Sequence, residues 1–249
     1  MSDQSTFRWT SASRTDVGNE RQVNEDACLD LPARGFWAVA DGMGGHAAGD
    51  VASQMLVSKL SGVDSHDKFS DFVDDIEDRV LEVNQRLHDM SIEGEEARVI
   101  GSTLAALLAF GPNVVSMWVG DSRVYLLRQG GLLIQVTRDH SEVEEMIEQG
   151  TLDQESALDH PSANIVTRAV GGSPDLYVDM ELGKLEDKDR FLICSDGLFK
   201  DLLEEEIEQL VGEGSCVEAC DSLIDTALER ECSDNVTVVV VEFNETESE

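Results

Sequence analysis

The sequence predicts an α+β domain, in which antiparallel strands form the core and amphipathic helices pack against them. Residues 102–136 contain four apolar runs separated by glycine-containing turns, which predicts an antiparallel meander. Residues 47–60 and 68–90 instead carry apolar side chains at helical spacing, which predicts two helices that each bury one face. Aspartates follow several of the apolar runs. The fold is therefore expected to place acidic side chains at the ends of its strands.

The N-terminal part begins with a loosely alternating strand and a charged, turn-rich segment. Two more strands follow, and the short connection near Pro32 to Gly35 predicts that they form an antiparallel pair with acidic groups at their ends. The predicted strands are residues 7–13, 27–31 and 37–40, and the charged segment is 14–26.

In the C-terminal part, Ser141 can cap a helix that has glutamates in its first turn, where acidic side chains are favourable. Residues 150–163 are polar and irregular, which is typical of an excursion over a site. The remaining predicted strands are 165–170, 177–182, 190–194 and the β-branched end of 231–243, and the remaining helices are 204–211 and 217–228.

Composition limits the possible partners. The 249 residues are 41% hydrophobic, which is sufficient for the core of one large domain or two small ones. The 52 acidic and 18 basic residues give a formal net charge of −34. Such a surface makes nucleic acid an unsuitable partner. Solubility explains much of the acidic excess, but it does not explain aspartates that directly follow apolar runs, because burial of a carboxylate is costly without a compensating cation or donors.

The cysteines and the N-terminus indicate a soluble, cytoplasmic protein that does not enter a membrane. The five cysteines lack the CxxC spacing of a zinc or redox site, so reduced thiols are expected. The first residues lack the basic start and apolar run of a signal peptide, and no apolar span approaches 18 residues. The cysteines are Cys28, Cys194, Cys216, Cys220 and Cys232.

The stretch FWAVADGMGGHAAG, residues 36–49, is the strongest local signal. An apolar strand runs into Asp41, and glycines then allow close approach of the main chain to a ligand. The side chain of Asp41 and the carbonyl of Gly42 are suited to binding Mg²⁺ or Mn²⁺, which prefer oxygen donors. Residues 190–197 repeat the order of strand, aspartate and glycine at Asp196. The repetition suggests that both aspartates serve one site.

The acidic residues at strand ends and adjoining turns together predict a metal centre. Without cations, carboxylates at close range raise one another's pKa values. Two divalent ions would offset them, lower the pKa of a bridging water and orient a phosphoryl group for in-line attack. Arg21 offers a guanidinium fork for phosphate oxygens. No signature of a P-loop or of a covalent nucleophile is present. The candidate acidic residues are Glu25, Asp26, Asp41, Asp121, Asp196 and Asp234.

Eight short motifs in order give the chain a resemblance to bacterial members of the protein phosphatase 2C family, the metal-dependent Ser/Thr phosphatases. Each motif alone is weak, but the ordered set spans almost the whole chain. The motifs are RQVNED at 21–26, ADGMGGHAAG at 40–49, GST at 101–103, GDSR at 120–123, TRDHS at 137–141, TRAVGG at 167–172, SDGL at 195–198 and SDN at 233–235. The resemblance implies a central β-sandwich of two antiparallel sheets flanked by α-helices on both sides, with Mn²⁺ or Mg²⁺ in a cleft at one end.

The resemblance also implies a role for each acidic residue. Asp41 matches the carboxylate that bridges both metals, and the carbonyl of Gly42 matches a ligand of one of them. Asp26 matches the residue that orients metal-bound water, and Arg21 matches the phosphate-binding arginine. The remaining matches are Glu25, Asp196 and Asp234 as ligands of the other metal, Asp121 and Asp196 as ligands of a third metal, and residues 141–163 as a flap beside the cleft. The catalytic domain is expected to span residues 1–243, followed by an acidic tail, 244–249.

Two positions depart from the family pattern. Lys200 stands where family members often carry an aspartate, so either a third metal does not bind or Lys200 replaces its charge. Met43 stands where eukaryotic relatives have a histidine proposed as general acid. Protonation of the leaving group would then fall to metal-bound water or to another group, for which His46 is one candidate.

Three functional hypotheses follow from these residues. The first is a protein Ser/Thr phosphatase that hydrolyses phosphoserine and phosphothreonine by direct attack of a metal-bridging water. The alternative is a catalytically weak relative that acts as a metal-stabilised phosphoprotein-binding module, and a third possibility is an acidic protein without a metal site. The partners implied by the first are a bacterial Ser/Thr kinase and its phosphothreonine-reading substrates, and the protein is expected to be a monomer. Because of the −34 charge, phosphosites flanked by basic residues should be preferred.

Overall fold

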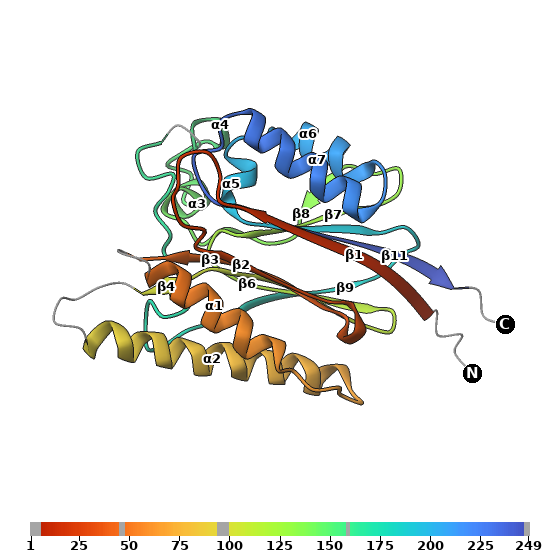
Figure 1. Ribbon diagram of the computed structural model, residues 1–249, viewed down its shortest axis with the longest axis horizontal. Helices are drawn as coiled ribbons and strands as arrows, with labels where there is room; N and C mark the ends of the chain where they lie inside the picture. Colours follow the sequence, from red (N-terminus) through yellow and green to blue (C-terminus); the bar gives the residue numbers. More distant parts are fainter. Residues whose placement is uncertain (1–5, 45–47, 94–99, 158–159, 247–249) are drawn as a thin grey trace.

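Two antiparallel β-sheets lie face to face, and helices cover the outer face of each (Figure 1). The computed structural model describes residues 6–44, 48–93, 100–157 and 160–246. His46, one candidate for a general acid, lies outside these described residues. The predicted α+β class and the four-layer arrangement of helices and sheets are confirmed.

The first sheet contains both ends of the described chain. Its strand order is β1, β11, β10, β7 and β8, and β1 pairs with β11 along its whole length. Strand β11 lies between β1 and β10, and its valines pack under α7 and in the core between the sheets. The elements are β1 (Thr6–Asp16), β7 (Arg123–Leu127), β8 (Leu133–Gln135), β10 (Arg190–Cys194), β11 (Val236–Thr246), α5 (Asp196–Phe199), α6 (Glu204–Gly212) and α7 (Cys216–Glu229). Strand β11 therefore continues three residues beyond the boundary expected at residue 243.

The second sheet has the order β2, β3, β5, β6 and β9, and β4 pairs with β3. Its outer face packs against α1 and α2, whose apolar faces were predicted from their helical spacing. Its inner face meets the first sheet in an aromatic core, where Trp37 and Phe243 pack edge to face. The elements are β2 (Asp26–Leu31), the 3-10 helix η1 (Pro32–Arg34), β3 (Phe36–Met43), α1 (Ala48–Ser61), α2 (Phe69–Glu93), β4 (Gly101–Ser102), β5 (Leu104–Phe110), β6 (Asn113–Val119) and β9 (Asp179–Lys184).

The predicted meander over residues 102–136 is wrong. Its two hairpins exist, but β5 and β6 belong to the second sheet whereas β7 and β8 belong to the first. The chain changes sheets at Gly120, which has a φ of 101°, a value that favours glycine. The predicted strand at 165–170 is also absent as a strand, because this segment makes only isolated bridges from Val166 and Val170.

The segment expected to form a flap contains two short helices, α3 (Glu142–Glu148) and α4 (Gln154–Ala157). Ser141 caps α3 as predicted, since its hydroxyl accepts a hydrogen bond from the backbone N–H of Glu144. All five cysteines lie in described segments and are free thiols, as expected. Within the described ranges, no helix combines the length and hydrophobicity needed to cross a membrane.

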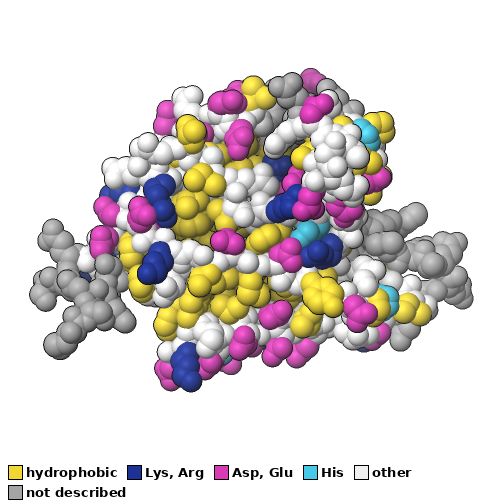
Figure 2. All heavy atoms as spheres, turned by 180° about the vertical axis from the view of Figure 1, so that it is seen from behind, with side chains coloured by type: hydrophobic (Ala, Val, Ile, Leu, Met, Phe, Trp, Pro, Cys, Tyr) yellow, Lys and Arg dark blue, Asp and Glu magenta, His cyan; other side chains and the backbone are white. Residues whose placement is uncertain are grey.

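Seen from behind relative to Figure 1, the molecule exposes hydrophobic side chains between scattered acidic ones (Figure 2). The edge strands β8 and β9 contribute exposed apolar side chains, among them Ile134 and Leu182.

Candidate metal centre

Both sheets contribute acidic residues to one end of the sandwich. Asp26 and Asp41 are direct cross-strand partners where β2 begins and β3 ends. Asp196 follows β10 and begins α5, and Asp234 precedes β11. Asp121 lies in the crossing between β6 and β7. Residues that are far apart in the sequence are thus brought together by the pairing of the strands.

Asp26 is buried and is held from the other sheet. Its Oδ2 accepts hydrogen bonds of 2.7 Å from the hydroxyls of Ser195 and Thr237. Its Oδ1 is buried without a hydrogen-bond partner among the described residues. The pKa of Asp26 is raised to about 7, chiefly by burial and to a smaller extent by the nearby charge of Asp196, while the two hydrogen bonds oppose the shift.

The main chain holds Asp41 firmly in position. Its N–H donates to Thr103 Oγ1 at 3.0 Å, and its carbonyl accepts from the Thr103 N–H at 2.8 Å. Burial raises the pKa of Asp41 well above its usual value, and repulsion from Asp26 and Asp196 adds to the effect. The side chain of Asp41 is therefore poised beside other negative charges, as the sequence predicted.

Gly42 allows the backbone of β3 to meet the first turn of α1. A Cβ atom at Gly42 would lie 2.0 Å from the carbonyl oxygen of Gly49 and 2.7 Å from that of Glu25, so no larger residue fits. The N–H of Gly42 donates to the Glu25 carbonyl at 3.1 Å. This close approach brings Glu25 beside Gly42, as their predicted roles in one site require.

The ammonium of Lys200 pairs with Asp196 and is influenced by the charge of Asp121. Lys200 Nζ forms an ion pair with Asp196 Oδ2, while Asp196 Oδ1 is buried without a hydrogen-bond partner in the described chain. Burial raises the pKa of Asp121 to about 7, mainly with the help of Asp196, and Lys200 opposes the shift. Burial lowers the pKa of Lys200, but Asp196 and Asp234 raise it overall. The lysine therefore stays charged among the carboxylates.

Asp234 pairs with two cationic side chains. Arg21 Nη2 lies 2.9 Å from Asp234 Oδ1 and 3.0 Å from Oδ2, and Lys200 Nζ lies 3.6 Å from Oδ2. Arg21 is half exposed, and Asp234 is the main cause of its raised pKa, with smaller contributions from Glu25 and Asp41. The predicted phosphate-binding arginine thus lies beside the carboxylates, and in this arrangement it binds one of them.

The residues fit divalent ions after a rearrangement of side chains. No three Asp, Glu, His or Cys groups among the described residues are arranged closely enough to hold an ion as they stand. The carboxylates nevertheless repel one another, and the buried Oδ1 atoms of Asp26 and Asp196 have no described hydrogen-bond partner. Such atoms are costly unless a cation or a water satisfies them. An oxygen-only donor set is the set that Mg²⁺ and Mn²⁺ prefer.

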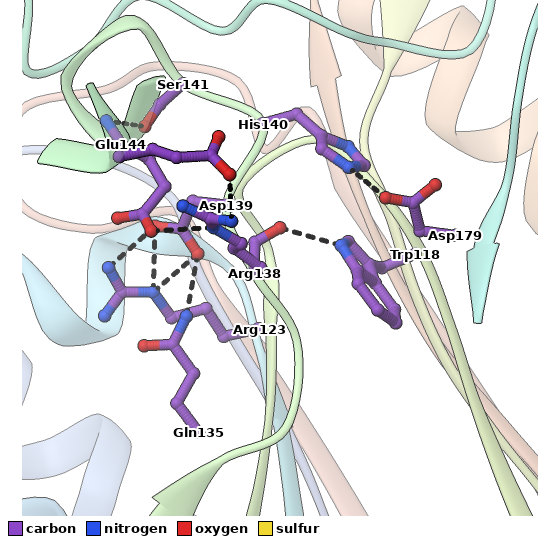
Figure 3. Close-up of polar contacts among 10 residues, drawn as sticks. Trp118, Arg123, Gln135, Arg138, Asp139, His140, Ser141, Glu144 and Asp179 are labelled. Carbon is purple, nitrogen blue, oxygen red and sulfur yellow. Dashed lines mark hydrogen bonds and ion pairs between the residues drawn. The ribbon is translucent and has the colours of Figure 1, made fainter. Parts of the chain in front are cut away.

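A polar network around residues 138–144, whose contacts Figure 3 shows, adjoins this group through Asp139. Arg123 binds Asp139 through Nε and Nη2, at 3.0 and 2.7 Å, and the charge of Asp139 contributes to the raised pKa of Asp121. His140 stacks on Trp118 and bonds Asp179 through Nε2 at 3.0 Å. A cavity of about 400 Å³ lies here, lined by Arg138, Asp139, His140, Glu144, Glu145, Glu148, Gln149, Thr167, Arg168 and Asp179.

Several residues that support the site were missed from the sequence. The side chain of Asn235 accepts from the Glu25 N–H at 2.7 Å and donates to the carbonyls of Val17 and Val23. Ser195 and Thr237 hold Asp26. Each adjoins a candidate acidic residue or lies in the following strand, and buried polar side chains at such positions are the signal that could have found them.

Comparison with known proteins gives a consistent result. A family model described as protein phosphatase 2C matches residues 18–233. The serine/threonine protein phosphatase PstP of Mycobacterium tuberculosis is 35% identical over 231 residues, which cover 93% of this chain and 44% of PstP. The chain therefore spans less than half the length of that relative.

Solved structures agree with this match. PppA of Pseudomonas aeruginosa, described as a key regulatory component of T6SS, is 38% identical with a TM-score of 0.89, covering 97% of this chain and 100% of that one. The catalytic domain of PstP in complex with two manganese ions is 33% identical with a TM-score of 0.86, covering 96% and 100%. Since the family model matches most of the chain, this chain belongs to the protein phosphatase 2C family of serine/threonine protein phosphatases.

Proposed function

We propose that this protein is a metal-dependent protein serine/threonine phosphatase, which hydrolyses phosphoserine and phosphothreonine by direct attack of water. The observation that carries the proposal is a group of mutually repelling carboxylates in which Asp196 keeps one buried oxygen free for a cation and Asp26 keeps one free for a water. Two Mn²⁺ or Mg²⁺ ions bound there would lower the pKa of a water between them and orient the phosphoryl group for in-line attack. PstP, which shares the family, binds two manganese ions.

Each side chain has a proposed task. Asp41 would bind both ions and the carbonyl of Gly42 would bind one of them, while Glu25, Asp196 and Asp234 would hold the other. Asp26 is fixed through Oδ2 by Ser195 and Thr237, so its free Oδ1 can orient the attacking water. Arg21, which pairs with Asp234 in the structure, would bind the phosphate oxygens of the substrate, because a guanidinium fork matches phosphate geometry.

The cellular setting is also a proposal. Residues 1–243 form a single catalytic domain with the flap at 141–163, and the protein acts as a monomer in the cytoplasm. Its substrates are proteins phosphorylated by a bacterial Ser/Thr kinase, including those that read phosphothreonine. Support for these statements comes from family analogy. The net charge of −34 supports a preference for phosphosites that are flanked by basic residues.

Turnover by purified protein tests the proposal. With Mn²⁺ the protein should hydrolyse p-nitrophenyl phosphate and a phosphothreonine peptide, and EDTA should abolish both reactions. Asp41→Asn should lower kcat/KM by at least roughly two to three orders of magnitude, equivalent to about 3 to 4 kcal/mol of barrier. Asp71→Asn on the exposed first turn of α2 removes the same charge and should leave the rate unchanged. Equal rates for both variants would reject the assignment, and Mn²⁺ binding without turnover would favour the phosphoprotein-binding module.

A further inference from the structure

Lys200 places a cation among the proposed metal ligands. It is the C-cap residue of α5, one turn after Asp196, and its side chain is only 28% exposed. Its ammonium contacts Asp196 Oδ2 and lies 3.6 Å from Asp234 Oδ2. A lysine at this position of the helix can reach back to the carboxylate at i−4 without distorting the backbone. The chain therefore supplies a positive charge of its own at the point where acidic side chains converge.

This ammonium satisfies only part of the local charge. Asp196 Oδ1 remains buried with no hydrogen-bond partner in the described chain, although Oδ2 of the same carboxylate is paired with Lys200. Asp234 is shared between Lys200 and Arg21. Two monovalent side chains thus hold two carboxylates that a single divalent ion could hold more fully. The side-chain cations and an ion consequently compete for the same oxygen atoms.

We propose that Lys200 is a resident cation that stabilises the metal-free centre and competes with a divalent ion for Asp196 and Asp234. The inference rests on the proposed metal-dependent function, and it concerns how tightly the metal is held. In the metal-free protein, the ammonium reduces the repulsion between carboxylates that would otherwise loosen this end of the sandwich. An ion that uses both carboxylates must displace the ammonium and overcome its repulsion. Lys200 therefore weakens metal binding while it protects the metal-free fold.

The test compares the full-length protein with three variants. Lys200→Met keeps a side chain of similar length without the charge, and Lys200→Arg keeps the charge. Lys59→Met is the matched control, because Lys59 pairs with Glu82 between α1 and α2. For each protein, thermal unfolding is measured in EDTA, and the Kd and stoichiometry for Mn²⁺ are measured by isothermal titration calorimetry.

Lys200→Met should lower Tm in EDTA by roughly 5 °C or more, because it leaves a buried carboxylate without its partner. The same variant should bind Mn²⁺ at least roughly tenfold more tightly, equivalent to about 1.4 kcal/mol, with an unchanged number of ions. Lys200→Arg and Lys59→Met should both stay close to the wild type.

Three results would overturn the inference: a Tm in EDTA that is unchanged or raised, a Kd that is equal or weaker, or an additional bound ion at unchanged Kd. The last result would mean that the ammonium occupies a separate cation position rather than the metal ligands. Failure of the proposed function has a different signature: either neither the wild type nor any variant binds Mn²⁺, or the wild type binds Mn²⁺ without hydrolysing a phosphothreonine peptide. Failure of the Lys200 inference alone leaves Mn²⁺ binding intact, with the same Kd in wild type and Lys200→Met.

Discussion

Removal of divalent ions should make the stability of the protein fall as pH rises from 5 to 8. Asp26 and Asp121 are both buried, and the pKa of each is raised from 3.8 to about 7. Between pH 3.8 and about pH 7, the native state therefore binds more protons than the unfolded state. The stability that these two carboxyl groups contribute is fully present below about pH 4 and is lost as the pH approaches 7.

The expected magnitude follows from this shift. For one carboxyl with these two pKa values, the free energy of unfolding falls by about 3 kcal/mol between pH 5 and pH 8. The two residues influence each other through Asp196, so their contributions are not additive. One such contribution lowers Tm by roughly 6 to 12 °C in a domain of this size.

Thermal unfolding checks this prediction. It is measured in EDTA and in saturating Mn²⁺, each at several pH values from 5 to 8. Mn²⁺ should remove the decline, since bound ions keep the native carboxylates ionised. Asp26→Asn should reduce the slope in EDTA, because it removes one of the titrating groups. A Tm in EDTA that stays flat or rises with pH would refute the reasoning, and so would a decline that persists in Mn²⁺.

Three further predictions concern phosphate binding, the hydrogen bond of His140 and the sequence around the phosphosite. Arg21→Lys should raise KM for a phosphothreonine peptide about tenfold while Mn²⁺ affinity changes little, since lysine cannot form the guanidinium fork; steady-state kinetics and calorimetry check this, and an unchanged KM would argue against phosphate binding by Arg21. His140 Nδ1 accepts a hydrogen bond from the Gly120 N–H at 3.0 Å, and an asparagine side chain can keep this acceptor. In urea unfolding, His140→Asn should therefore be less destabilising than His140→Gln by roughly 1 to 3 kcal/mol, and equal losses would show that this bond matters little. A phosphothreonine peptide flanked by arginines should give a higher kcat/KM than one flanked by glutamates, and the ratio should shrink as KCl is added; a ratio of one at low salt would contradict the electrostatic argument.

The parts of the site that could be predicted from sequence are those with a local signature. Asp41 and Asp196 each follow a buried apolar run and precede glycine, and the structure places both at one end of the sandwich. Glycine at position 42 has a physical reason, because a Cβ there would collide with the backbone of Gly49. Signals of this kind depend on a few neighbouring residues, so they are visible without the fold.

Other features depend on contacts between distant segments. The crossing of the chain at Gly120 separates two hairpins that look continuous in sequence, because turn signals do not say which sheet a strand joins. Asn235 holds Glu25 and two carbonyls of the segment 14–26, a role that only the folded chain reveals. The sequence placed Lys200 near the centre but could not show that its ammonium binds Asp196. Long-range packing decides each of these features.

The position of β11 affects when the chain can assemble its acidic group. This strand lies between β1 and β10, and Asp234 and Asn235 immediately precede it. During synthesis, β1 therefore cannot pair with β11 until nearly all of the described chain has left the ribosome. Pairing across such a long sequence separation is slow. A nascent or truncated polypeptide that ends before this strand has no partner for β1 and no Thr237 to hold Asp26, so under the proposed function it would lack phosphatase activity.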